Sequence, residues 1–389
     1  SAKEVEKVMK IFIARETDPK ELRIPVIPAT VDKLVKLGAT IEVESGAGQS
    51  LQIADDEFVK AGATISSNRQ ASLSSADMIL RLRKPSADES KLCKKGCIHV
   101  SYLDPFNERA LVQSLADAGV SAVSLEMIPR TTIAQKMDVL SSQANLAGYV
   151  AVILAAERST KIFPMMMTPS GTISPSRVFI IGVGVAGLQA IATAKRLGAL
   201  VEAFDTRPVV EEQVKSLGAK FVKVDLGETG QTKDGYAKAL TEEQLQKQRA
   251  AMAKACANAD VVITTAQVFG KKAPRIVTTE MVKAMKPGSI VVDLAVETGG
   301  NVECAKLDEE VVVNGVRVIG LANMPGRVAV NASQMYSNNV SNFIEHFWNK
   351  ETKSFDLKIE DEIIKGCLIT HGGAIVNETI RNIVQGAKT

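Results

Sequence analysis

Six residues near the middle of the chain, Gly182–Gly187 (GVGVAG), have the spacing of a dinucleotide-binding turn. The β-rich run 176–181 leads directly into Gly182, and residues 188–197 after the turn have a helical pattern. In such a unit the first glycine permits a tight turn, the second lets the backbone approach a pyrophosphate, and the third lets helix and strand pack closely. Unpaired N–H groups at the helix start favour an anion. We therefore predict a cofactor phosphate site at this turn.

Asp205 stands 18 residues beyond Gly187, at the end of the next predicted strand. A carboxylate there accepts hydrogen bonds from a ribose 2′-hydroxyl and repels a 2′-phosphate, which predicts NAD rather than NADP. Arg207 weakens that preference, because an arginine nearby can bind a phosphate. The alternative is a turn of glycines with an unrelated aspartate. Gly46 and Gly48 form no second fingerprint and are interpreted as an ordinary tight turn.

A proton donor or acceptor for a carbonyl substrate is harder to find. A dehydrogenase that oxidises an alcohol or amine moves a proton as well as a hydride, usually with a positioned His or Lys. The chain has three histidines, His99, His346 and His371, and none lies in the stretch that we assign to the cofactor domain. We interpret them as surface or core residues. A reaction that needs only hydride transfer would explain the pattern.

The elements around these residues alternate in type, which predicts βαβ units and parallel sheets. The fold class that we predict is α/β, with two Rossmann-like domains, the second inserted in the first, joined by connecting helices. The predicted domains are 1–135 plus 331–389, and a cofactor domain at 136–330. Strands are expected at 10–14, 40–43, 78–82, 97–102, 177–182, 201–205, 221–224, 261–264, 290–293 and 316–319, with connecting helices at 132–159 and 329–348. A mobile loop is expected at 227–234.

The composition narrows the class of protein. Of 389 residues, 46% are hydrophobic and 23% charged, which is typical of a globular protein. A net charge of +3 and only 4% aromatic residues argue against nucleic-acid binding. Five cysteines match no zinc pattern, so we expect reduced thiols and no metal. Polar residues or glycines interrupt the two long uncharged stretches, 139–156 and 178–194, so we expect no membrane crossing. The charged N-terminal residues predict no signal peptide.

Five segments, 127–149, 163–168, 182–198, 235–238 and 293–301, resemble the NAD(H)-binding component, domain I, of the proton-translocating NAD(P) transhydrogenases. The resemblance covers almost the whole chain from Lys10. It implies a homodimer that binds NAD (NADH) and exchanges hydride with NADP on a partner domain, domain III. It also implies coupling to a membrane-spanning domain II. The expected location is peripheral to a membrane, on the cytoplasmic face of a bacterial inner membrane or the matrix side in mitochondria.

The resemblance also assigns residues. The family's Arg-Gln-Asp loop falls on Arg130, Gln135 and Asp138, which we predict to be catalytic by positioning the nicotinamide. Asp138 and Arg130 can pair to hold the loop, although capping of the following helix is the alternative. Tyr236 matches the tyrosine of a mobile loop that closes over the cofactor, where Asp234 replaces a usual glycine. The predicted cofactor-binding set is Arg130, Gln135, Asp138, Ser141, Gly182, Gly184, Val185, Ala186, Gly187, Asp205, Thr206, Arg207, Gly235, Tyr236, Gln248 and Gln267.

Alanine dehydrogenase, an enzyme complete in itself, is the second hypothesis, on the resemblance of 79–85 and 100–104. That family's substrate lysine falls on Arg83, its catalytic histidine on Asp104, and an aspartate of a further motif on Glu297. An arginine is always charged and cannot act as a base, and a free aspartate is ionised at neutral pH. These replacements argue against amino-acid oxidation. A sensor that binds NAD without catalysis is the third hypothesis.

Overall fold

The protein is described by a computed structural model that covers residues 7–228, 233 and 238–386. The chain divides into two compact units. The first comprises Ser1–Ser142 and Ala329–Thr389, and the second comprises Gln143–Val328. The second unit is therefore inserted between two segments of the first. Most of the predicted mobile loop, 227–234, lies outside the described residues.

The described residues of the first unit form a sheet in the order β19-β18-β6-β5-β4-β1-β2-β3. Its strands are β1 (Lys10–Ile13), β2 (Thr40–Glu44), β3 (Thr64–Ser66), β4 (Met78–Arg83), β5 (Ile98–Tyr102), β6 (Ser121–Ser124), β18 (Leu368–His371) and β19 (Ala374–Ile375). Strands β1 to β6 pair in parallel, whereas β18 is antiparallel to β6 and to β19. The Rossmann-like prediction is thus confirmed for the parallel part. The antiparallel edge comes from the C-terminal segment, which returns to complete the sheet.

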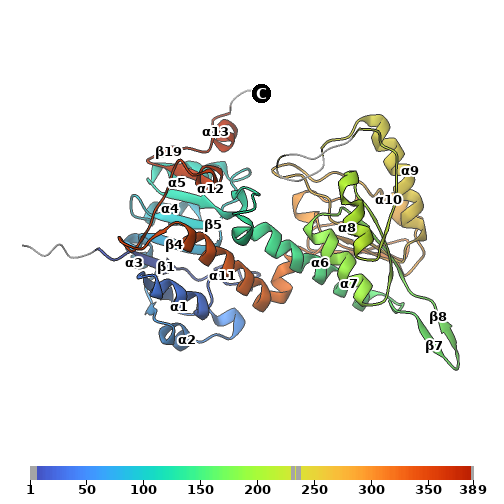
Figure 1. Cartoon of the computed structure of the whole chain (residues 1–389), viewed down its shortest axis with the longest axis horizontal. Helices are drawn as coiled ribbons and strands as arrows, with labels where there is room; N and C mark the ends of the chain where they lie inside the picture. Colours follow the sequence, from blue (N-terminus) through green and yellow to red (C-terminus); the bar gives the residue numbers. More distant parts are fainter. Residues whose placement is uncertain (1–6, 229–232, 234–237, 387–389) are drawn as a thin grey trace, which may run out of the picture. The chain divides into compact units, whose positions relative to one another are not determined.

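Helices complete the first unit, and the chain's two ends share one core there. They are α1 (Pro28–Lys36), α2 (Asp55–Lys60), α3 (Arg69–Ser75), α4 (Ala87–Leu92), α5 (Arg109–Asp117), α11 (Ala329–His346), α12 (Glu362–Cys367) and α13 (Glu378–Val384), with a small ribbon of β16 (Trp348–Asn349) and β17 (Ser354–Phe355). Helix α11 lies beside α1 (Figure 1). The Ser337 hydroxyl bonds to Thr30 Oγ1 at 2.7 Å, and Trp348 Nε1 donates to the Leu37 carbonyl at 2.9 Å.

The second unit has the strand order β11-β10-β9-β12-β13-β15-β14. Its strands are β9 (Arg177–Ile181), β10 (Leu200–Phe204), β11 (Lys220–Phe221), β12 (Val261–Thr264), β13 (Ile290–Asp293), β14 (Glu310–Val313) and β15 (Val316–Ile319). All pair in parallel except β14, and the order reverses direction between β9 and β12. Such a switch point is where open α/β sheets bind ligands, at the carboxyl ends of the strands. The helices are α6 (Val139–Arg158), α7 (Val185–Arg196), α8 (Glu211–Ser216), α9 (Glu242–Asn258) and α10 (Thr279–Lys283).

Two predicted elements differ from the structure by more than two residues at one end. The helix expected from residue 132 begins at Val139, because residues 135–137 form a separate 3₁₀ turn. The strand expected at 221–224 is only Lys220–Phe221. The described 3₁₀ segments are η1 (Gln49–Leu51), η2 (Leu125–Met127), η3 (Gln135–Met137), η4 (Pro208–Val210), η5 (Val296–Thr298) and η6 (Met324–Val328).

Helix α6 is long and apolar enough to cross a membrane by length and composition alone. Its second half, however, packs in the apolar core of the second unit, where Val150, Val152 and Ala155 are buried. A Cβ atom added at Gly148 would lie 2.3 Å from the Ala186 carbonyl oxygen, so α6 and α7 are in close contact there. These contacts are those of a core helix.

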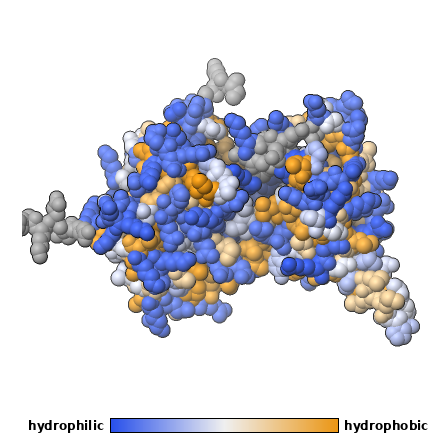
Figure 2. All heavy atoms as spheres, viewed as in Figure 1, coloured by the Kyte–Doolittle hydropathy of each residue, from blue (hydrophilic) through white to orange (hydrophobic). Residues whose placement is uncertain are grey.

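A hairpin of β7 (Met166–Thr168) and β8 (Gly171–Ile173) extends from the second unit (Figure 1). All six of its strand residues are exposed, and Met167 keeps 77% of its surface accessible. Figure 2 shows this projection with pale apolar colouring near its base. The hairpin was not predicted from the sequence, because its strands are too short to show a period.

Candidate functional site

The Gly182–Gly187 turn connects the carboxyl end of β9 to α7. Gly182 has a φ of 91°, a conformation that favours glycine. A Cβ atom added at Gly187 would lie only 1.9 Å from the Gly182 carbonyl oxygen, so no other residue fits without moving the turn. At Gly184 nothing lies within 4 Å of the added atom. Position 184 is therefore open to a ligand, while position 187 is closed by the protein itself.

Asp205 follows β10, the neighbour of β9, and its carboxylate reaches the turn. The Val183 backbone N–H donates to Asp205 Oδ2 at 2.8 Å, and the Arg207 N–H donates to Oδ1 at 2.8 Å. The Arg207 side chain also forms an ion pair with Asp205. Thr206 lies between them and is partly buried. The structure therefore brings together Gly182, Val183, Asp205 and Arg207.

The glycine turn and the loop after β12 are held by residues that the sequence analysis did not assign to the site. Thr265, directly after β12, donates its hydroxyl to the Gly182 carbonyl at 2.8 Å. The fully buried Asn301 side chain accepts from Ala266 N–H at 3.0 Å and donates to Ala266 O at 2.8 Å. Burial raises the pKa of Asp293. Its carboxylate accepts the backbone N–H groups of Ala295 and Val302, at the two ends of the loop that follows β13. Thr265 and Asp293 stand at the ends of buried strands, and Asn301 lies in the 293–301 segment that carries the resemblance; these were the sequence signals for them.

The remaining predicted residues of the second unit are in different surroundings. Gln267 follows β12, is exposed, and donates to the Leu294 carbonyl at 3.3 Å. Gln248 lies in α9 and is 4% exposed, and its Oε1 has no hydrogen-bond partner among the described residues. Val185 and Ala186 form the first turn of α7. Gly235 and Tyr236 lie outside the described residues.

The predicted Arg-Gln-Asp loop belongs to the first unit. Arg130 and Gln135 have exposed side chains. The Asp138 carboxylate caps the start of α6, because it accepts the Ser141 N–H at 3.0 Å and the Ser141 hydroxyl at 2.6 Å. The structure therefore brings Asp138 and Ser141 together in a helix cap. The pairing of Asp138 with Arg130 stays a prediction.

Two of the positions that match the alanine dehydrogenase site, Arg83 and Asp104, already have partners within the chain. Arg83 Nε lies 2.7 Å from Glu21 Oε2, and Arg23 Nε lies 2.9 Å from Glu21 Oε1. Burial opposes ionisation of Glu21, but the hydrogen bond and charge of Arg23 outweigh it and lower the pKa of Glu21. Asp104 accepts from Asn107 Nδ2 at 2.8 Å. The Glu21 carboxylate thus pairs with both Arg23 and Arg83.

The histidines lie outside the second unit, as the sequence places them. His99 is buried on β5, and neither ring nitrogen has a hydrogen-bond partner in the described part of the chain. Burial, aided by Arg81, lowers the pKa of His99 to about 3, so its ring is neutral. His371 Nδ1 lies 2.8 Å from the Ser121 hydroxyl. Among the described residues, no group of three His, Cys, Asp or Glu side chains could hold a metal.

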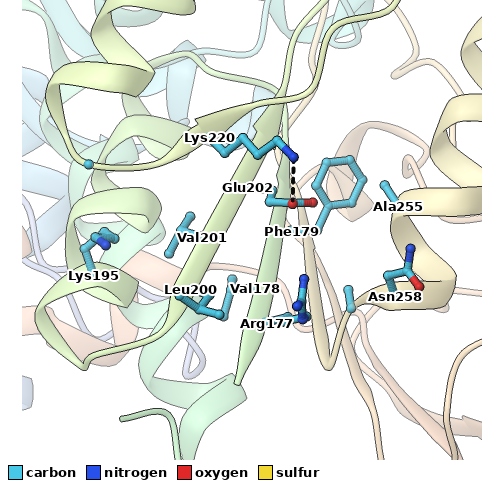
Figure 3. Close-up of a pocket in the computed structure, with 12 residues that line it drawn as sticks. Arg177, Val178, Phe179, Lys195, Leu200, Val201, Glu202, Lys220, Ala255 and Asn258 are labelled. Carbon is cyan, nitrogen blue, oxygen red and sulfur yellow. Dashed lines mark ion pairs between the residues drawn. The ribbon is translucent and has the colours of Figure 1, made fainter. Parts of the chain in front are cut away.

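A pocket of about 240 Å³ opens at the opposite edge of the second unit's sheet (Figure 3). It is lined near the amino ends of the strands by Arg177, Leu200 and Glu202, and Lys220 faces Glu202 with 4.0 Å between Nζ and Oε1. None of its lining residues belongs to the predicted cofactor set. The glycine turn, at the carboxyl end of β9, is a separate place on this unit.

Two Rossmann-like units, one with a glycine turn at the switch point of its sheet and an acidic residue after the neighbouring strand, define a nucleotide-binding α/β protein. Family models give the same two parts: "Alanine dehydrogenase/PNT, N-terminal domain" matches residues 12–147, and "Alanine dehydrogenase/PNT, C-terminal domain" matches residues 151–378. The chain belongs to the alanine dehydrogenase/PNT family, as a relative of the transhydrogenase alpha subunits.

Individual relatives support this. The chain is 46% identical over 386 residues to the first of the alpha-subunit chains of the Rhodospirillum rubrum NAD(P) transhydrogenase, with 97% of this chain and 100% of the relative covered. A solved transhydrogenase structure from Sinorhizobium meliloti matches with a TM-score of 0.85 and 46% identity, covering 94% of this chain and 100% of that one. A solved L-alanine dehydrogenase matches less closely, with a TM-score of 0.80 and 25% identity over 97% and 99% of the two chains.

Proposed function

We propose that this chain is the NAD(H)-binding component of a proton-translocating transhydrogenase. It binds NADH and passes hydride to NADP on a partner domain, or takes hydride back from NADPH. The membrane-spanning domain of the same complex couples this exchange to proton movement. The chain itself acts at the membrane surface, on the cytoplasmic or matrix side.

The observation that carries the proposal is the Gly182–Gly187 turn with Asp205 beside it. Backbone N–H groups at the start of α7 suit the pyrophosphate, and position 184 is open for it. We assign to Asp205 the hydrogen bond with the adenosine ribose, as the spacing from the glycine turn suggests. The resemblance assigns the nicotinamide to Arg130, Gln135 and Asp138. Hydride transfer between two nicotinamides requires close approach and orientation but no proton transfer in that step.

Reconstitution tests the proposal. The isolated chain is expected to bind NADH, with a dissociation constant roughly in the micromolar range or weaker, and to reduce nothing by itself. Adding the NADP-loaded partner domain is expected to start rapid hydride exchange without any membrane component. The absorbance change of a nicotinamide analogue measures the rate of this exchange. Absence of exchange at saturating partner concentrations would refute the proposal.

Alanine oxidation is the competing activity, and the arrangement of Glu21 argues against it. Arg83, which stands at the matching position, and Arg23 are both paired with that internal carboxylate. Alanine-dependent NAD reduction is therefore expected to be absent even at high substrate. Robust turnover with alanine, or with pyruvate plus ammonia, would reverse the order of the two hypotheses.

The homodimer is part of the proposal, and the β7–β8 hairpin is the surface that best supports it. Met165, Met166, Met167 and Ile173 are exposed large apolar side chains on and beside this hairpin. A contiguous exposed apolar group of this kind marks an interaction site. A second copy of the chain is the occupant that we propose, because a two-fold interface uses the same patch on both copies.

A further inference from the structure

The loop that carries Gln135 is fixed at its backbone by helix α11. We propose that Asn339 and Asn342 are positioning residues for hydride exchange, because they hold this loop in place. The inference rests on the proposed function of the loop and adds two residues that the resemblance did not assign. All the residues involved belong to the first unit.

The anchor is the carbonyl oxygen of Lys136, the residue after Gln135. Asn339 Nδ2 donates to this oxygen at 2.9 Å, and Asn342 Nδ2 donates to it at 2.9 Å. A carbonyl oxygen has two lone pairs, and the two amides use both. The peptide unit between Lys136 and Met137, one residue beyond Gln135, is therefore held from two directions.

The two asparagines stand on a rigid support. Asn339 is buried, and its Oδ1 accepts the Ser142 hydroxyl at 2.7 Å, which turns the NH₂ group toward Lys136. Helix α11 is itself tied to the sheet, because the buried Tyr336 hydroxyl donates to the Arg81 carbonyl at 2.8 Å. A donor on such a helix places its acceptor more accurately than a donor on a loop does.

The side chains of the loop are buried at its two ends and exposed between them, which fits this role. Ala134 and Met137 are buried in the core of the first unit, whereas Gln135 and Lys136 are exposed between them. The 3₁₀ turn Gln135–Met137 thus presents Gln135 outward while its neighbours and the Lys136 carbonyl are fixed. A small displacement of a positioning group is enough to slow a reaction that depends on orientation.

The test is Asn342→Ala, with Asn342→Asp as a variant of the same shape that cannot donate. Asn342 is only partly buried, and alanine favours a helix, so the fold is expected to persist. We expect both variants to slow hydride exchange with the NADP-loaded partner domain about fivefold, as the loss of one hydrogen bond implies. NADH affinity and the thermal midpoint should stay near the parent values. Asn338→Ala, on the same helix and partly exposed, is the matched control and should exchange at the parent rate.

A second readout does not depend on catalysis. Trypsin cleaves after lysine, and cleavage between Lys136 and Met137 requires the anchored peptide to open. Mass spectrometry should therefore find this cleavage accelerated in Asn342→Ala and unchanged in Asn338→Ala. Slower exchange together with faster cleavage supports the inference. Faster cleavage with parent-rate exchange overturns the positioning role, and unchanged cleavage overturns the anchor. A parent chain that exchanges no hydride would refute the proposed function, while the cleavage rates still decide whether the asparagines anchor the loop.

Discussion

Arg207 binds both carboxylate oxygens of Asp205, with 3.0 Å between Nε and Oδ1 and 2.9 Å between Nη2 and Oδ2. The same Nη2 donates to the Val183 carbonyl at 3.1 Å, so the pair is joined to the glycine turn. Both side chains are largely buried. A ribose at this carboxylate would share it with an arginine, and the repulsion of a 2′-phosphate is weaker than a lone aspartate would give.

Replacing Asp205 separates these effects. Asp205→Ala is expected to weaken NADH binding by ~1.5–3 kcal/mol, the range for a hydrogen bond to a charged group. Because Arg207 then loses its carboxylate partner, the preference for NADH over NADPH should also fall. Fluorescence titration with each nucleotide measures both effects. Glu202→Ala, in the strand that precedes Asp205 but away from the turn, is the control, and unchanged affinity in Asp205→Ala would exclude the ribose assignment.

Gly187 and Gly184 should respond differently to the same substitution. Gly187→Ala places a Cβ against the Gly182 carbonyl, so we expect both a lower thermal midpoint and loss of NADH binding. Gly184→Ala has free space for the Cβ, so the thermal midpoint should be nearly unchanged while NADH affinity falls, since the added methyl obstructs the pyrophosphate. Calorimetry and titration of the two variants check this. Equal behaviour of the two would contradict the roles given to these glycines.

Gln135→Asn tests the loop directly. The substitution shortens a positioning contact by one methylene, so hydride exchange with the partner domain should slow tenfold or more, on the order of a misplaced reacting group. NADH affinity should change by less than twofold. Stopped-flow exchange and titration give the two numbers, and Gln334→Asn, an exposed glutamine on α11, serves as control. A mutant complex that exchanges at the parent rate would remove the loop from the site.

His99 should make the protein less stable in acid. Burial lowers its pKa from 6.5 to about 3 in the folded chain, so the unfolded chain binds a proton that the folded chain does not. Its contribution is therefore complete above pH 6.5 and is lost as the pH falls toward 3. In His99→Leu the urea midpoint should decline less between pH 6.5 and 4 than in the parent. His346→Gln, which changes an exposed histidine, should leave the parent profile intact; a parent-like slope in His99→Leu would disprove the assignment.

The hairpin should control assembly. Met166→Ser with Met167→Ser removes exposed apolar surface without touching a packed core, so the thermal midpoint of the subunit should be retained. We expect the dimer to dissociate at concentrations where the parent remains dimeric, which light scattering measures. Val312→Ser, an exposed apolar residue on β14, is the control. A parent that is monomeric at all concentrations would remove the homodimer from the proposal.

The elements that were predicted well are those whose formation depends on residues near one another in the sequence. Strands Val261–Thr264, Ile290–Asp293 and Val316–Ile319 were predicted with these bounds, because each consists mostly of valine and isoleucine, as is typical of strands in a sheet that is covered on both faces. The start of α6 was wrong. Apolar spacing continues through the 3₁₀ turn, and only the Asp138 cap shows where the α-helix begins. The antiparallel strands β14, β18 and β19 were not predicted, and β19, with two residues, is too short to show alternation.

The site residues fall into the same two groups, those with a local sequence signal and those placed by contacts distant in sequence. The glycine turn and Asp205 could be predicted because their spacing follows from one βαβ unit. The supporting contacts of Thr265 and Asn301 could not, because their partners, Gly182 and Ala266, lie in loops distant in sequence. Asn339 and Asn342 are about 200 residues from Lys136, and only the return of the C-terminal segment brings them together.

The pairing of Glu21 with Arg23 and Arg83 affects how this scaffold can change. A dissolved carboxylate that sought these arginines would have to displace one that is attached to the same chain, whose effective concentration is on the order of millimolar or higher. A metabolite carboxylate at a concentration below that level would be outcompeted by Glu21, with no need for a barrier that blocks its access to the arginines. Engineering an amino-acid substrate into this chain would therefore have to begin by removing the internal competitor, before any catalytic base is added.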